Sequence, residues 1–168
     1  MKGLEAGHGL GATAFVLDDA ERKLTRERLG GELYLVGAVR NYVLLRLDEL
    51  LANQPGVSYQ HKLITVEHVL PPQTPKDDSK WVEHFSDDER AYWTHRLANL
   101  VLLNRRKNSA AQRFDFDEKK RRYFSGANGV ATFALTSQVL AHRSWTPAVL
   151  DERQELLMKR LIDEWELN

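Results

Sequence analysis

Two short stretches of strand-forming residues stand in a chain that is otherwise patterned for helices. Residues 62–66 are short and rich in β-branched side chains, and they run directly into Glu67 and His68. Pro71 and Pro72 end this stretch, because proline has no N–H to donate to a sheet. Leu100–Leu103 forms the second apolar stretch. The pattern predicts an α+β fold: a mainly helical domain around a small two-stranded element.

The remaining segments predict helices. Between residues 32 and 53 apolar side chains recur every three or four positions, as on one face of a helix. Thr146 and Pro147 predict the start of a last helix, because threonine caps helices and proline suits their first position. The expected helical segments are 32–53, 81–96, a basic stretch ending near 124, 132–142 and 147–165. Residues 1–31 are interpreted as a lead-in segment, flexible or at the edge of an excised piece, and 32–168 as a single domain.

Composition excludes several classes of protein. The chain of 168 residues has no cysteine, which rules out disulfides and cysteine-bound zinc. Its longest apolar runs are about five residues, too short to cross a membrane, and no signal peptide is recognisable. We therefore expect a soluble cytoplasmic protein. Although 24 basic and 24 acidic residues balance, eight basic and only three acidic residues lie between Asn104 and Arg122. Such a block can attract phosphates or simply be a solvated helix face.

The residues with the most chemical potential lie around the two predicted strands. A neutral imidazole such as that of His68 can remove a proton from water near neutral pH. The neighbouring carboxylate of Glu67 can bind a divalent cation, and an asparagine amide oxygen is a hard ligand suited to Mg²⁺ or Mn²⁺. Side chains alternate along a strand, so Glu67 and His68 can serve one centre only if the strand twists or ends there.

The order and spacing of these residues resemble a known family. Glu67-His68-Val-Leu-Pro71 is followed by Leu97-Ala-Asn99-Leu-Val-Leu-Leu103, and Asn108 comes nine residues after Asn99. This set resembles HNH (ββα-metal, His-Me finger) nucleases. It is similar in particular to the C-terminal domain of GmrSD-type modification-dependent restriction enzymes and of SspE-type phage-defence proteins. The similarity covers roughly residues 35–165 and continues in Phe133–Gln138, in Trp145-Thr-Pro147 and in Glu152-Arg153.

The resemblance implies a metal-dependent DNA endonuclease or nicking endonuclease of a restriction or phage-defence system, with its finger at about residues 62–112. His68 would be the general base that activates water, and Asn99 would brace the loop of the catalytic centre. Glu67 and Asn108 would bind one divalent cation, Mg²⁺ or Mn²⁺. The residues implied to contact the backbone of double-stranded DNA are Arg105, Arg106, Lys107 and Lys119. The family also implies a ParB-like nucleotide-hydrolysing domain, fused to or missing from the N-terminal side.

Some features depart from the family or leave alternatives open. Many relatives have aspartate where this chain has Glu67, and many brace the finger with a zinc site that needs cysteines. Asn104, four residues before Asn108, is the alternative metal ligand. The other histidines are interpreted as surface or packing residues, although His84 and His95 lie between the two strands and could approach the site. A non-catalytic DNA-binding module and a helical protein-interaction domain remain the alternative functions.

Overall fold

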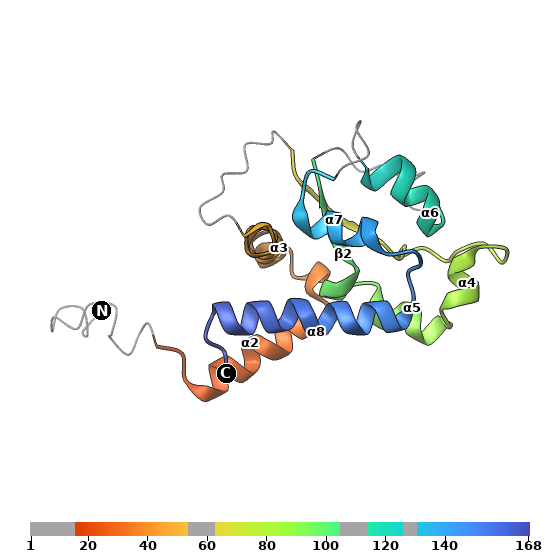
Figure 1. Cartoon of the computed structure of the whole chain (residues 1–168). Coiled ribbons are helices and arrows are strands. Elements are labelled where there is room, and N and C mark those ends of the chain that lie inside the picture. Colours follow the sequence, from red (N-terminus) through yellow and green to blue (C-terminus); the bar gives the residue numbers. More distant parts are fainter. Residues whose placement is uncertain (1–15, 54–62, 105–113, 126–130) are drawn as a thin grey trace, which may run out of the picture.

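The computed structural model describes residues 16–53, 63–104, 114–125 and 131–168. Helices surround a small antiparallel sheet, as the α+β prediction requires (Figure 1). The helices are α2 (Asp19–Gly30), α3 (Gly37–Ala52), α4 (Lys80–His84), α5 (Asp87–Trp93), α6 (Phe116–Lys119), α7 (Ala134–Ala141) and α8 (Pro147–Glu164). The shorter turns are η3 (Leu33–Leu35), η4 (Leu97–Asn99) and the π-helical η6 (Lys120–Phe124). None of the helices described here is long and apolar enough to cross a membrane.

The sheet consists of β1 (Thr65–His68) and β2 (Leu100–Leu103). The strands run antiparallel, with Glu67 opposite Val101 and His68 opposite Leu100. The prediction of the second strand is confirmed residue for residue. The first strand begins at Thr65, later than predicted, and it ends in Glu67 and His68 as the sequence predicts.

Each face of the sheet is covered by its own hydrophobic core. Val101 and Leu103 pack with a core that contains Trp81 and Trp145. Leu100 and Leu102 pack with the other core, which holds residues of α3, α7 and α8 together. Because both faces are buried, the four residues of β2 are apolar without alternation, and the sequence shows a continuous apolar run.

The interpretation of residues 1–31 as a lead-in segment is wrong for residues 19–30, which form α2. Asp18 caps this helix in a reciprocal pair with Glu21, and the helix lies beside α8 (Figure 1). Its surface is strongly polar, and Leu29 is its only buried residue. A single buried leucine leaves no apolar periodicity in the sequence, which is why the helix was not predicted.

The predicted helix 81–96 is two helices. α4 ends at His84, and α5 begins after Ser86, whose hydroxyl accepts from the Glu89 N–H while the Glu89 carboxylate accepts from the Ser86 N–H. This capping box starts a new helix, because it satisfies backbone N–H groups that a continuous helix would bond internally. The last helix begins as predicted, with Thr146 as its cap and Pro147 as its first residue.

Candidate active site at the end of the two-stranded sheet

His68 is the last residue of β1 and is 7% exposed. Its Nε2 atom lies 3.2 Å from Nδ1 of His95, within hydrogen-bonding distance. The centroid of its ring lies 4.0 Å from that of Tyr34. The structure thus surrounds the predicted general base with two aromatic residues that come from distant parts of the chain.

Tyr34 connects His68 and His95 to the N-terminal part of the fold. Its ring lies nearly parallel to that of His95, with centroids 5.5 Å apart and an interplanar angle of 18°. Its N–H donates to the carbonyl of His95 at 3.0 Å. Arg40 of α3 also contacts Tyr34: its guanidinium is 4.5 Å from the Tyr34 ring centroid, and its Nη1 donates to the Tyr34 carbonyl at 2.7 Å. No sequence motif connects Tyr34 to His68, so Tyr34 is a site residue that the sequence does not predict.

Glu67 and His68 point to opposite faces of the sheet, because side chains alternate along a strand. Glu67 pairs with Val101, which belongs to the core of Trp81, whereas His68 pairs with Leu100 of the other core. Glu67 is buried on its side, close enough to Lys119 for its charge to act on that ammonium. The structure therefore places the carboxylate and the imidazole on opposite faces of the sheet, at neighbouring positions at the end of β1.

Lys119 is buried, with 2% of its surface exposed. Its Nζ donates to the carbonyls of Val69 at 2.7 Å and of His68 at 3.2 Å. Burial lowers the pKa of this ammonium to about 7, and the negative charge of Glu67 opposes the decrease. The prediction that Lys119 contacts a DNA backbone is wrong for this arrangement. The side chain is buried, and its ammonium is hydrogen-bonded to the backbone at the end of β1. A lysine in a basic stretch is ordinarily exposed, and no local pattern predicts the burial of this one.

Asn99 is fully buried. It is the last residue of η4, the turn that directly precedes β2. Its Oδ1 accepts from the Leu70 N–H at 2.7 Å, and its Nδ2 donates to the carbonyls of Leu70 and Thr94, both at 2.9 Å. The Trp145 indole N–H also points to Oδ1, at 3.3 Å. These contacts hold the loop that leaves His68.

Two side chains of helix α8 form hydrogen bonds with the turn that carries Asn99. Arg153 is buried and donates through Nε to the Ala98 carbonyl at 2.9 Å and through Nη2 to the Leu135 carbonyl at 3.1 Å. Gln154 accepts from the Ala98 N–H at 2.9 Å. Both residues therefore fix η4, the turn that carries Asn99. From the sequence alone, Glu152 and Arg153 are interpreted as a surface or intramolecular pair rather than catalytic groups; the burial of the guanidinium does not fit a surface pair.

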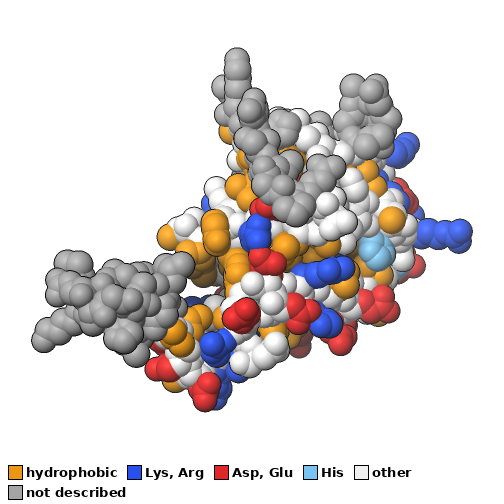
Figure 2. Space-filling model, turned by 60° about the vertical axis from the view of Figure 1, so that its left-hand side comes forward, with side chains coloured by type: hydrophobic (Ala, Val, Ile, Leu, Met, Phe, Trp, Pro, Cys, Tyr) orange, Lys and Arg blue, Asp and Glu red, His pale blue; other side chains and the backbone are white. Residues whose placement is uncertain are grey.

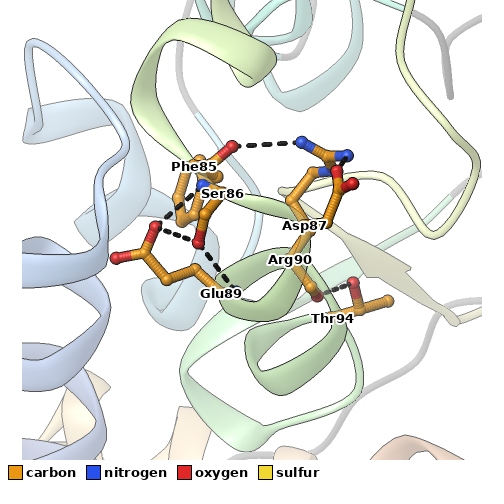
Figure 3. A network of polar contacts seen from close by, with 6 residues as sticks. All are labelled: Phe85, Ser86, Asp87, Glu89, Arg90 and Thr94. Carbon is orange, nitrogen blue, oxygen red and sulfur yellow. Dashed lines mark hydrogen bonds and ion pairs between the residues drawn. The ribbon is translucent and has the colours of Figure 1, made fainter.

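A polar hollow of about 270 Å³ lies beside the loop that follows β1. Its lining includes Pro72, Thr74, Arg90 and Thr94. Figure 3 shows how the α5 side of this hollow is fixed: Arg90 donates to the Phe85 carbonyl at 3.0 Å and pairs with Asp87, while the Thr94 hydroxyl donates to the Arg90 carbonyl at 2.6 Å. Thr94 immediately precedes His95, so this network also steadies the turn that carries the second histidine.

Four of the predicted site residues lie outside the described part of the chain. They are the metal ligand Asn108 and the basic residues Arg105, Arg106 and Lys107. In the described ranges no group of three or more histidine, cysteine, aspartate or glutamate side chains is arranged to bind a metal. The carboxylate of Glu67 nevertheless has the donor chemistry of a Mg²⁺ or Mn²⁺ ligand. Such ions are commonly bound by one or two side-chain oxygens together with water and phosphate.

Positive and negative side chains are interspersed on one face of the molecule. On the face shown in Figure 2, Lys and Arg alternate with Asp and Glu among scattered hydrophobic side chains. Arg121 and Arg122 are exposed, and Arg122 pairs with Glu118 at 3.3 Å. Four of the eight basic residues between positions 104 and 122 lie outside the described ranges: Arg105, Arg106, Lys107 and Arg113.

Comparison with known proteins identifies one family. The family model described as GmrSD restriction endonucleases, C-terminal domain, matches residues 18–160. The match begins at the cap of α2 and so includes the helix that the sequence pattern had assigned to a lead-in. No curated protein and no solved structure matches the chain.

Proposed function

Because this chain belongs to the family of GmrSD restriction endonuclease C-terminal domains, we propose that it hydrolyses phosphodiester bonds of double-stranded DNA. In this proposal it is the HNH-type nuclease or nickase domain of a restriction or phage-defence protein. A ParB-like nucleotide-hydrolysing domain, in the same chain or a partner, would govern when it acts.

The observation that supports this proposal best is the position of His68. It ends β1, and the loop that follows is fixed by the hydrogen bonds of Asn99 and by the ammonium of Lys119. A general base must be held in one orientation to take a proton from an attacking water, and these contacts supply that rigidity. His68 acts as the base in this proposal, and Asn99 as the residue that braces it.

Glu67 and Asn108 would bind the divalent cation, Mg²⁺ or Mn²⁺. When bound, such a cation stabilises the charge that develops on the phosphoryl group and the leaving 3′ oxygen. Because Glu67 and His68 point to opposite faces of the sheet, a scissile phosphate that both residues act on would have to lie at the end of β1. Arg105, Arg106 and Lys107 would contact the DNA backbone, which positions the duplex without reading its sequence.

The test is cleavage of supercoiled plasmid by the wild-type chain and by His68→Ala, with Mg²⁺, Mn²⁺ or EDTA. We expect nicked or linear product that requires metal and a decrease in rate of about 10²-fold or more in the variant. His84→Ala is the matched control, because His84 lines a separate small cavity together with Lys80 and Arg143. Full metal-dependent cleavage by His68→Ala would refute the assignment of the base. Salt-sensitive DNA binding without cleavage would instead indicate a non-catalytic DNA-binding module.

A further inference from the structure

We infer that His95 is a positioning residue that sets the orientation and the tautomer of His68. The inference rests on the proposed function, in which His68 is the general base. It is drawn from the 3.2 Å approach of His68 Nε2 to His95 Nδ1.

A hydrogen bond between two imidazoles restricts which nitrogen of each ring carries a proton. A neutral imidazole carries one N–H and one nitrogen lone pair, and the partner of one nitrogen determines which role the other takes. One of the two nitrogens must carry a proton and the other a lone pair, and in this inference His95 Nδ1 is the acceptor, so that the proton of His68 is on Nε2 and its lone pair is on Nδ1. His68 then presents Nδ1 as the nitrogen that takes a proton from water. His95 does not itself touch the reacting atoms.

The backbone on each side of His95 is anchored by tertiary hydrogen bonds. The Tyr34 N–H donates to the His95 carbonyl at 3.0 Å, and Asn99 Nδ2 donates to the Thr94 carbonyl at 2.9 Å. On the other side of His95, Arg96 donates to the carbonyl of Gly30 at the end of α2. The backbone around His95 is therefore held by the distant segment of Gly30 and Tyr34 and by the nearby side chain of Asn99.

Asn99 forms hydrogen bonds with the backbone close to both histidines. The same side chain that bonds the Thr94 carbonyl also bonds the N–H and the carbonyl of Leu70, two residues after His68. The distance between the two imidazoles is consequently fixed through one buried residue. The Tyr34 ring contacts both imidazoles and limits their rotation.

Two variants separate this role from simple packing. His95→Phe keeps a flat ring against Tyr34 but has no nitrogen to accept a hydrogen bond. His95→Asn is smaller, but its Oδ1 can occupy the position of Nδ1 and accept the same bond. A packing residue would tolerate phenylalanine better than asparagine, whereas a positioning residue would tolerate asparagine better.

The first measurement uses no metal and no DNA. The full chain is labelled with ¹⁵N, and the ring nitrogens of His68 are observed by NMR at pH 8, about 1.5 units above the ordinary pKa of histidine. We expect a slowly exchanging proton on Nε2 of His68 in the wild type and in His95→Asn, and its loss in His95→Phe. A proton on Nδ1 in the wild type, or an unchanged Nε2 proton in His95→Phe, would overturn the inference.

The second measurement is plasmid cleavage. We expect His95→Phe to lower kcat by about 10- to 100-fold with little change in KM, as for residues that orient a reactive histidine. His95→Asn should remain within about threefold of the wild type, and His84→Ala should be unaffected. Cleavage by His95→Phe at the wild-type rate would contradict the inference. If the wild-type chain does not cleave DNA, the proposed function fails, while the NMR result still decides whether His95 orients His68.

Discussion

The side chain of Asn99 pairs with the peptide backbone of Leu70 in both directions. Oδ1 accepts from the Leu70 N–H at 2.7 Å, and Nδ2 donates to the Leu70 carbonyl at 2.9 Å. Next to this pair, the Val69 N–H donates to the carbonyl of Asn99 at 2.9 Å. A side chain thus extends the pairing beyond the last strand residue, His68. These three hydrogen bonds fix the loop that follows the candidate base, His68, in the way that strand pairing fixes β1.

Replacing Asn99 should destabilise the whole fold. Asn99→Asp keeps the shape and the acceptor for the Leu70 N–H, but it turns an oxygen toward the carbonyls of Leu70 and Thr94. Asn99→Ala leaves all three buried backbone groups without this partner. We expect each variant to lower the free energy of unfolding by about 3 kcal/mol or more, measured by urea denaturation. The exposed Asn104 provides the control, since Asn104→Ala should have little effect. Wild-type stability in Asn99→Asp would contradict this reading of the contacts.

The burial of Lys119 should make stability depend on pH. In the folded chain its pKa is lowered to about 7, whereas in the unfolded chain it keeps the ordinary value of 10.5. Between these values the unfolded chain binds one more proton, so stability increases as the pH is raised from about 7 toward 10. The contribution is at most about 1.4 kcal/mol per pH unit.

Lys119→Met removes this titration. We therefore expect the free energy of unfolding of the wild type to increase relative to that of the variant as the pH rises. Denaturant titrations at pH 6, 8 and 10 measure it. Lys159→Met is the control, because Lys159 is exposed and pairs with Asp163 on the surface of α8. A difference that stays constant over this range would show that Lys119 does not titrate as proposed.

Arg153 should be essential for stability, because its buried guanidinium is hydrogen-bonded to backbone carbonyls. Burial lowers the pKa of its guanidinium, and its charge is balanced by the carbonyl groups of Ala98 and Leu135 and by the side chain of Gln138 at 2.6 Å. Arg153→Met leaves these acceptors buried and unpaired, so we expect a loss of about 3 kcal/mol or more.

Arg153→Lys should be intermediate, because an ammonium cannot reproduce the planar fork of the guanidinium. Thermal and urea unfolding measure both variants, with the exposed Arg160→Met as the control. If Arg153→Met unfolded at the same urea concentration as the wild type, the buried hydrogen bonds would not be supporting η4.

The capping box of α5 predicts a smaller effect. The Ser86 N–H and hydroxyl both donate to the Glu89 carboxylate at 2.8 Å, and these bonds hold the pKa of Glu89 below its ordinary value (Figure 3). Ser86→Ala removes the hydroxyl but keeps the backbone N–H. We expect a loss of about 1 kcal/mol in stability at neutral pH and a partial return of the Glu89 pKa toward its ordinary value.

An NMR titration of the Glu89 carboxyl and urea unfolding at pH 7 and pH 3 test this. A carboxylate with a lowered pKa stabilises the fold above its ordinary pKa, and this contribution is lost as the pH falls through the lowered value. The difference between Ser86→Ala and the wild type should therefore shrink at pH 3. The exposed Ser144→Ala serves as the control. An unchanged Glu89 pKa in Ser86→Ala would contradict the role of the hydroxyl.

Several elements could be predicted because their signals are local. The run Leu100–Leu103 is apolar at every position, and Thr146-Pro147 is a cap followed by a residue that suits the first helical turn. The α+β class and the family follow from such short patterns and from the spacing of Glu67, His68 and Asn99. The strand and cap signals are each encoded within a few neighbouring residues, and the family signal in the order and spacing of short motifs.

Burial and proximity were decided by the tertiary structure alone. Lys119 belongs to a basic stretch, yet it is buried because the carbonyls of His68 and Val69 receive its ammonium. Residues 19–30 carry no apolar stripe, yet they form a helix that packs beside α8. Tyr34, His68 and His95 are separated by about thirty residues each and meet only because η3, the sheet and the turn after α5 pack together. The sequence determines which residues can carry out the chemistry, because side-chain type and local spacing are written in it. Their environment depends on contacts between distant segments, which local periodicity does not encode.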